Sequence, residues 1–579
     1  MSRIAIIGMA CLFPGAADLR RYWDNICAGV DAIGEVPPAR WDSQYYDPDS
    51  TAVDRFYCRR GGFVDDLTDF DPLPFGIMPK LADAAEPDQL LTLKIGYQAL
   101  EDAGYATCDF DRARTGVIIG RGNYVSPGVL RLEQHVRLLP QVLQTLRDLF
   151  PDLSEAALSE VQKRLRGELS PYGPDVASSL IPNFTASRLA NRLDLGGAAY
   201  TVDAACASSL LALEQATRLL ATGEAEMMLV GGVHLSHDPT FWATFCQLGA
   251  LSRRGVISPL SAEADGILVG EGVGMVVLKR LADAERDHDR IYAVIDAVGS
   301  SSDGRSSSLV APSVSGQLLA LERAWAAVPM TRDRIGLVEA HGTGTPTGDG
   351  IELETLAAFF GTAGDDERAV IGSVKSMIGH AMPASGMASL IKTAMAIYHG
   401  VLPPTLHCQQ PHPLLAKTRF RVTDTPESWQ QAPAERVAAV NAFGFGGINA
   451  HVVLSGVASA EPVSEALPAV LLLTAADPAA LLLQLDAGKD KGQFSAAAEQ
   501  ALRTEPDLLT AGPGFAGTDD LARGGQTTGI RREHGETARR IRQRIREHGH
   551  RCTGNDGIEL QQQGRRISRC QQQHRWQCL

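Results

Sequence analysis

The sequence predicts an α/β fold made of two similar halves. Apolar runs that are continuous rather than alternating recur along the chain, as expected for strands buried on both faces. Helix-forming stretches lie between these runs, and the same alternation of strand and helix occurs in both halves of the chain. A hydrophobic content of 44% and a charged content of 21% fit a globular protein with a sizeable core.

Glycine flanks most of the predicted strands, which follow one another in chain order. They are Ile4–Ile7, Thr115–Gly120, Tyr200–Val202, Met227–Gly232, Gly274–Leu278, Ile291–Val298, Ile335–Glu339, Val370–Val374, Val437–Val440 and His451–Leu454. The main predicted helices between them are Pro87–Ala103, Ser209–Thr222, Ser315–Ala327 and Ser385–Tyr398. An insertion over 124–180, rich in helix formers such as Leu153–Gly167, is expected to cap a site entrance or a dimer edge.

Cys206 stands where the short strand Tyr200–Val202 turns into an apolar helix. The free N–H groups at the start of that helix favour a thiolate, although a lone buried cysteine is usually an inert packing residue. Two histidines strengthen the functional interpretation. His341 and His380 each follow an apolar strand in a loop rich in small residues, where active sites of layered α/β proteins are built. The three residues together predict a Cys-His-His nucleophilic site.

The chain resembles the β-ketoacyl synthases (ketosynthases) of fatty acid and polyketide assembly over roughly residues 3–454. Six motifs carry the resemblance in the expected order: Ile4–Gly15, Asp203–Ser209, Ala264–Gly274, Glu339–Thr345, Lys375–His380 and Asn441–Asn449. Tyr57–Phe63 and Ser300–Arg305 look most similar to ketosynthases of type I iterative polyketide and polyunsaturated fatty acid synthases. Ala85–Leu91 departs from the pattern usual in modular polyketide synthases, which favours the same subgroup.

This resemblance implies a thiolase-like five-layer α-β-α-β-α fold that is normally a homodimer. Residues 1–285 would form the half that holds Cys206, and residues 286–454 the half that holds both histidines. It also implies an acyltransferase that performs decarboxylative Claisen condensation, with no permanently bound cofactor. The substrate would arrive on the phosphopantetheine of an acyl carrier protein, either a separate protein or a downstream domain.

The family pattern gives each site residue an expected role. Cys206 would hold the acyl chain as a thioester, because thiolates exchange readily with thioesters. His341 and His380 would donate N–H groups to the malonyl thioester oxygen and stabilise the enolate as CO₂ leaves. Lys375 would orient the site electrostatically.

A second group of residues would surround these four. Phe445, between Gly444 and Gly446, matches a gating residue whose N–H would form an oxyanion hole with that of Cys206. The glycines alone are also typical of a tight turn. The remaining expected roles are pantetheine binding for Thr343 and Thr345, and partnership with Lys375 or an ordered water or ion for Asp349 and Glu352.

Composition excludes other classes of function. A net charge of −14 argues against a nucleic-acid binder, which needs a basic face. No run approaches the ~20 apolar residues of a membrane helix, and the start is typical of a core strand rather than a signal peptide. The ten cysteines lack zinc-type spacing, so we expect no metal site and a reduced, cytoplasmic setting.

The pattern changes after residue 454. We expect 455–490 to be a linker toward a missing acyltransferase domain, and 491–579 to be disordered or the product of a frameshift. Residues 531–579 hold twelve arginines against five acidic residues, and no lysine follows Lys491.

Three alternatives to the condensing enzyme stay open at this point: a Cys-His thioester hydrolase, an inactive or truncated platform that docks acyl carriers, and a decarboxylase or chain-length partner. The last usually lacks the cysteine that is present here.

Overall fold

The computed structural model describes residues 3–458, except 236–237, 306–308, 363 and 365–367, together with two short strands further on. The chain divides into two compact units, Met1–Ser459 and Ala460–Leu579. In the second unit β16 (Leu509–Thr510) pairs antiparallel with β17 (Gly529–Ile530). The predicted linker and tail therefore lie almost entirely outside the described residues.

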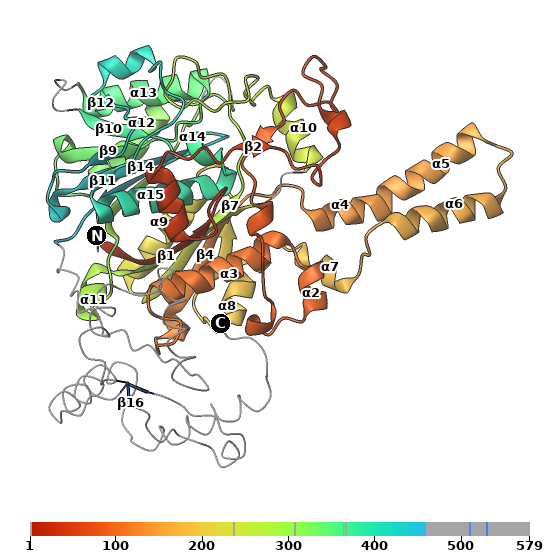
Figure 1. Cartoon of the computed structure of the whole chain (residues 1–579), viewed down its shortest axis with the longest axis horizontal. Coiled ribbons are helices and arrows are strands. Elements are labelled where there is room, and N and C mark those ends of the chain that lie inside the picture. Colours follow the sequence, from red (N-terminus) through yellow and green to blue (C-terminus); the bar gives the residue numbers. More distant parts are fainter. Residues whose placement is uncertain are drawn as a thin grey trace. The chain divides into compact units, whose positions relative to one another are not determined.

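An eleven-stranded sheet organises the first unit (Figure 1). Its order is β12-β10-β9-β14-β15-β8-β1-β7-β6-β4-β5. In chain order the strands are β1 (Ile4–Leu12), β4 (Thr115–Arg121), β5 (Ala199–Val202), β6 (Met227–His234), β7 (Gly272–Arg280), β8 (Ala293–Ser302), β9 (Ile335–Glu339), β10 (Ala369–Gly372), β12 (Phe420–Arg421), β14 (Val437–Gly444) and β15 (Ile448–Ser455).

The two ends of this sheet repeat one pairing pattern. In the first half β4 is parallel to β5 and β6, β6 is antiparallel to β7, and β7 is antiparallel to β1. In the second half β9 is parallel to β10 and β14, β14 is antiparallel to β15, and β15 is antiparallel to β8. Three residue pairs between β1 and β8 join the halves. The prediction of two similar halves is confirmed.

Helices lie in three layers around the strands. The main helices are α3 (Pro87–Asp102), α8 (Phe184–Arg192), α9 (Ser208–Thr222), α12 (Val314–Trp325), α13 (Pro346–Phe360) and α15 (Ser385–His399). Strand β1 shows the layering, because Ile4 and Ile6 pack with α9 and α15 whereas Ala5 and Ile7 pack with α3 and α8 on the other face. Strands β9 and β14 share one apolar cluster with α9 and α15, and residues on their other face share a second cluster with α12 and α13. The five-layer, thiolase-like fold is confirmed.

Helix α15 is buried almost all round, as its continuous apolar sequence requires. It ends at Gly400, which takes the left-handed conformation with φ of 67°. None of the described helices is long and apolar enough to cross a membrane. The smaller elements are α1 (Leu19–Cys27), α2 (Pro79–Ala84), α7 (Pro174–Ser179), α10 (Pro239–Gln247), α11 (Leu281–Arg286), α14 (Lys375–Ile378), β2 (Gly34–Glu35), β3 (Arg60–Gly61), β11 (Val401–Leu402) and β13 (Glu427–Ser428).

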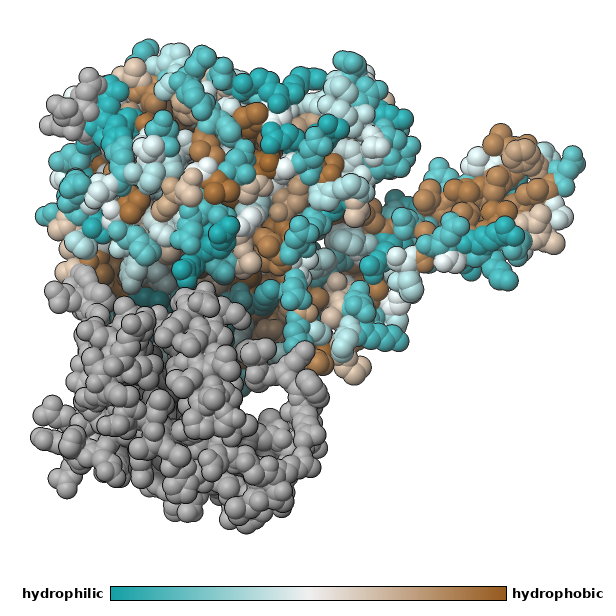
Figure 2. All heavy atoms as spheres, viewed as in Figure 1, coloured by the Kyte–Doolittle hydropathy of each residue, from teal (hydrophilic) through white to brown (hydrophobic). Residues whose placement is uncertain are grey.

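The predicted insertion forms a helical arm. It consists of α4 (Pro127–Glu133), a π-helix (Gln134–Leu138), α5 (Leu139–Leu149) and α6 (Glu155–Glu168). Figure 1 shows α5 and α6 extending away from the rest of the unit. Figure 2 shows a brown apolar stripe along the arm.

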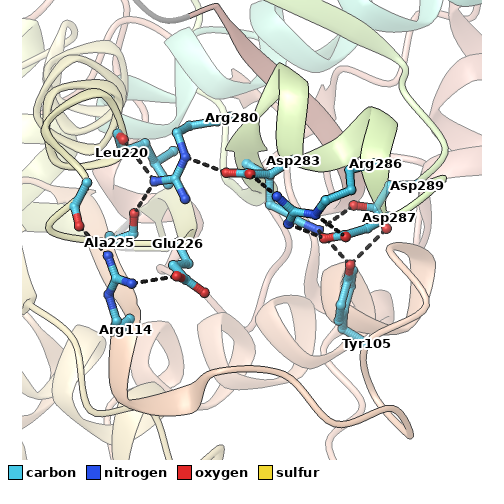
Figure 3. A network of polar contacts seen from close by, with 12 residues as sticks. Tyr105, Arg114, Leu220, Ala225, Glu226, Arg280, Asp283, Arg286, Asp287 and Asp289 are labelled. Carbon is cyan, nitrogen blue, oxygen red and sulfur yellow. Dashed lines mark hydrogen bonds and ion pairs between the residues drawn. The ribbon is translucent and has the colours of Figure 1, made fainter. Parts of the chain in front are cut away.

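A polar network fastens the connection between the two halves (Figure 3). Lys279 Nζ lies 2.7 Å from Asp289 Oδ2 and donates to Tyr105 Oη at 2.8 Å. Arg280 donates to the carbonyl oxygen of Leu220, near the end of α9, at 3.1 Å. Burial and the bond to Asp289 raise the pKa of Tyr105 to about 12, although Lys279 opposes them. The end of β7 is thereby tied to α9 and to the residues after α3.

Candidate active site

The nucleophile turn between β5 and α9 is held in a strained conformation. Ala205 takes φ of 49°, a region that residues other than glycine rarely occupy. Two side chains brace the turn: Asp203 accepts the Ala205 N–H at 3.1 Å, and Ser208 Oγ accepts the Ala204 N–H at 2.8 Å. Cys206, next in the chain, is 9% exposed immediately ahead of the helix.

The structure brings together the three residues on which the prediction rests. A side-chain atom of Cys206, one of His341 and one of His380 all lie within 4.8 Å of one another. His341 follows β9, and His380 follows β10 and α14, so the second half supplies both rings. The two imidazoles meet edge to face, with their centroids 5.5 Å apart.

A backbone contact fixes which nitrogen of His380 carries the proton. The Met382 N–H donates to His380 Nδ1 at 3.2 Å, so in the neutral ring Nε2 is protonated. Burial and the positive charge of Lys375 hold the pKa of His380 well below its usual value, and the ring stays neutral. Cysteine and two histidines are also a possible zinc ligand set, but a ring nitrogen that carries a proton donates and does not coordinate. The arrangement favours a hydrogen-bond donor.

Hydrogen bonds from the main chain to Glu352 hold His341 in place. Its N–H donates to Glu352 Oε1, and the Gly342 N–H donates to Glu352 Oε2, both at 2.8 Å. Burial, Lys375 and His380 hold the pKa of His341 well below the ordinary value. Both histidines therefore reach neutral pH as uncharged imidazoles.

The acidic residues behind His341 brace the loop. Asp349 accepts the N–H groups of Leu260, Thr343 and Gly344 at 2.7, 3.0 and 3.2 Å. Burial raises the pKa of Asp349 to about 7. Thr343 Oγ1 lies 3.0 Å from Thr345 Oγ1, which places the two predicted pantetheine hydroxyls side by side.

Lys375, the first residue of α14, is 1% exposed. Burial lowers its pKa, whereas the charges of Glu339 and Glu352 act in the opposite direction. Glu339 is a functional candidate that the sequence analysis missed, as is Lys392, whose Nζ lies 2.7 Å from Glu339 Oε2. Both are buried charges in apolar elements, the end of β9 and the middle of α15, and that mismatch was the available signal.

Burial raises the pKa of the Cys206 thiol. The Phe445 N–H, the charge of Lys375 and the Cys206 N–H itself lower it, but burial outweighs them. The expectation that the helix start alone would favour a thiolate is therefore corrected. The physical reason is the loss of hydration around a thiol that is almost fully enclosed.

The turn that carries Phe445, the predicted gate, lies between β14 and β15. Phe445 is 55% exposed, and Gly446 and Gly447 take φ of 98° and 80°. A Cβ on Gly444 would lie 2.6 Å from the Ala204 carbonyl oxygen, so only glycine lets this turn approach the nucleophile turn so closely. That approach lets the Phe445 N–H reach the Cys206 sulfur and lower the pKa of its thiol.

Family models match most of the chain. The β-ketoacyl synthase N-terminal domain matches residues 1–284, the C-terminal domain matches 292–409, and the ketoacyl-synthetase C-terminal extension matches 411–505. A phenolphthiocerol/phthiocerol polyketide synthase protein from Mycobacterium tuberculosis is 36% identical over 468 residues, which is 80% of this chain and 28% of that protein. The chain thus spans about a quarter of that relative's length.

Solved structures agree with this assignment. The ketosynthase from module 6 of the bacillaene synthase of Bacillus subtilis is 32% identical, with a TM-score of 0.66 over 84% of this chain and 77% of that one. PfaC keto synthase-chain length factor is also 32% identical, with a TM-score of 0.70 over 79% of this chain and 48% of that one. These equal identities do not separate subgroups. The chain belongs to the β-ketoacyl synthase family, as a ketosynthase of the kind found in polyketide synthases.

Proposed function

We propose that the chain condenses a Cys206-bound acyl group with a malonyl unit carried on an acyl carrier protein. The observation that carries this proposal is the cluster of one thiol and two neutral imidazoles within 4.8 Å, one imidazole fixed as a donor. Tyr57–Phe63 and Ser300–Arg305 further favour an iterative polyketide or polyunsaturated fatty acid system.

The first half-reaction loads the acyl chain. The Cys206 sulfur loses its proton and attacks the incoming thioester carbonyl, and the carrier's thiol leaves with a proton. The N–H groups of Cys206 and Phe445 would stabilise the oxyanion of the tetrahedral intermediate. Lys375 supports this step because its charge lowers the pKa of the buried thiol.

The second half-reaction forms the new C–C bond. The malonyl carboxylate leaves as CO₂, and its electron pair becomes an enolate on the thioester. Imidazole N–H groups of His380 and His341 would stabilise the enolate oxygen. The enolate carbon then attacks the acyl-Cys206 carbonyl, the cysteine sulfur leaves, and a β-ketoacyl chain remains on the carrier.

We place three further features with this function. Thr343 and Thr345 would hold the phosphopantetheine arm, and the chain would act as a homodimer. A reducing cytoplasm suits the seven cysteines within the described residues, all of which are free.

Mass measurement of the acyl-enzyme tests the proposal against hydrolysis and inactive docking. Incubation with an acyl thioester and malonyl-carrier protein should give acyl-Cys206 and then a β-ketoacyl product. Turnover to free acid would support a hydrolase, and absence of any adduct would support a docking platform. Cys246→Ala is the matched control, because Cys246 is buried in the same apolar cluster as Cys206 and should be dispensable for loading.

A further inference from the structure

The hydrogen bonds behind His341 continue away from the site through three buried side chains. Asn441, on β14, donates from Nδ2 to Glu352 Oε1 at 2.8 Å. Its Oδ1 lies 2.6 Å from Nδ1 of His451, the residue opposite it on β15. The indole N–H of Trp325, at the end of α12, donates to His451 Nε2 at 3.0 Å. The chain of contacts therefore runs from α12 across two strands to the carboxylate that holds His341.

The chemistry of its two ends gives this chain of bonds one direction. An indole N–H can only donate and an ionised carboxylate can only accept. Because His451 Nε2 accepts from Trp325, Nδ1 of the neutral ring carries the proton and donates to Asn441 Oδ1. The amide nitrogen of Asn441 is then left facing Glu352. Burial lowers the pKa of His451 to about 3, which keeps this ring neutral.

We propose that His451 is a positioning residue for His341, acting through the Asn441 amide on the Glu352 carboxylate. Glu352 holds the N–H groups of His341 and Gly342, so its orientation sets where the imidazole stands relative to Cys206. This inference rests on the proposed condensation, in which His341 stabilises the enolate.

Loss of the His451 donor has a second, electrostatic consequence. The groups that act on Glu352 are the Lys375 ammonium from α14, the Asp349 carboxyl from its own helix α13, the main-chain N–H groups of His341 and Gly342, and the Asn441 amide. Burial already raises the pKa of Glu352, while Asn441 and Lys375 lower it. If the amide turns away, that pKa rises further and Glu352 becomes protonated at a higher pH.

Three variants of the full chain test the proposal: His451→Leu, His451→Asn and Trp325→Phe. Asparagine keeps a donor near the Nδ1 position, and phenylalanine keeps the packing of Trp325 without its N–H. The measurements are CO₂ release from malonyl-carrier protein between pH 5.5 and 8, Cys206 acylation by acyl-carrier protein, and Tm. For His451→Leu we expect CO₂ release to fall about 10- to 100-fold, the scale of a lost bond to a charged group.

In His451→Leu, the pH below which CO₂ release declines (the acidic limb of the pH profile) should rise. The rate of Cys206 acylation should stay within about twofold of wild type, and His451→Asn should recover most of the rate of CO₂ release. A purely structural role of His451 would not change the pH dependence of CO₂ release. An active wild type with an unchanged rate and limb in His451→Leu overturns this inference. A wild type that releases no CO₂ overturns the proposed function instead. If His451→Leu fails to fold, Trp325→Phe decides: a smaller shift in the same direction supports the inference, and an unmoved limb contradicts it.

Discussion

At the scale of single residues, main-chain groups determine what the catalytic side chains can do. The Met382 N–H makes His380 a donor at Nε2, and the N–H of His341 is clamped by Glu352. Met382 takes φ of 46° to do so, a second strained position beside that of Ala205. Strain at two turns of one site is typical of structure retained for function.

The two half-reactions should separate by mutation. Cys206→Ala should lose acylation and condensation yet still decarboxylate malonyl-carrier protein, because the enolate needs only the imidazoles. His341→Ala or His380→Ala should slow decarboxylation about 10²–10³-fold, the usual cost of one lost oxyanion donor. CO₂ release and acyl-enzyme mass report the two steps. β-Ketoacyl product from Cys206→Ala would refute the assignment.

Removal of the buried cation should change the reactivity of the thiol. Lys375 lowers the pKa of Cys206, so Lys375→Met should raise that pKa further. At pH 7 we expect alkylation of Cys206 by iodoacetamide to slow roughly tenfold and to recover as the pH rises. Mass spectrometry of the modified peptide gives the rate at each pH. Lys417→Met, at an exposed lysine, is the control, and an equal slowing in both variants would argue against a local field.

Site residues could be predicted where a sequence motif contains them. They could not be predicted where only the fold brings distant residues together. Cys206, His341 and His380 are adjacent in space as expected. The bond from Met382 to His380 and the contacts of Trp325 with His451 join groups through backbone geometry or across two elements. No spacing in the sequence encodes such contacts.

At the scale of elements, long apolar runs were enough to find most of the sheet. The predicted Ile335–Glu339 coincides with β9, and Tyr200–Val202 with β5 apart from one residue. Strand β12 was missed because it pairs only two residues with β10 at the edge of the sheet, too few to leave a pattern. The sequence predicted that the arm is helical, but not that it extends away from the rest of the unit. The direction of the arm depends on which tertiary contacts its helices make, and helix-forming residues alone do not specify those contacts.

The arm should unfold separately from the sheet. Leu139, Leu143 and Leu158 form its small core, so Leu158→Ala should cost about 2–5 kcal/mol within a marginal helical hairpin. Hydrogen exchange should then lose protection across α5 and α6 and remain unchanged in β6 and β7. Leu149→Ala is the control because Leu149 is 67% exposed. Loss of protection throughout the sheet would mean that the arm is integral to the body.

At the scale of the whole molecule, the eleven-stranded sheet is complete within residues 4–455. We therefore expect removal of residues 491–579 to leave Tm and dimerisation unchanged. Differential scanning calorimetry and analytical ultracentrifugation of the shortened and full chains provide the measurement. A drop in Tm of several degrees, or loss of the dimer, would show that the removed residues stabilise the ketosynthase body.

The distribution of the site over both halves affects the newly made chain. Cys206 leaves the ribosome before Lys375 and His380 exist, and synthesis at about 5–20 residues per second makes that delay roughly 9–35 s. During this interval the thiol lacks the Lys375 charge and the Phe445 N–H that lower its pKa. A nascent chain therefore exposes an ordinary hydrated thiol, and the complete cluster of Cys206 with both histidines exists only after translation has passed β15 and the second half has folded.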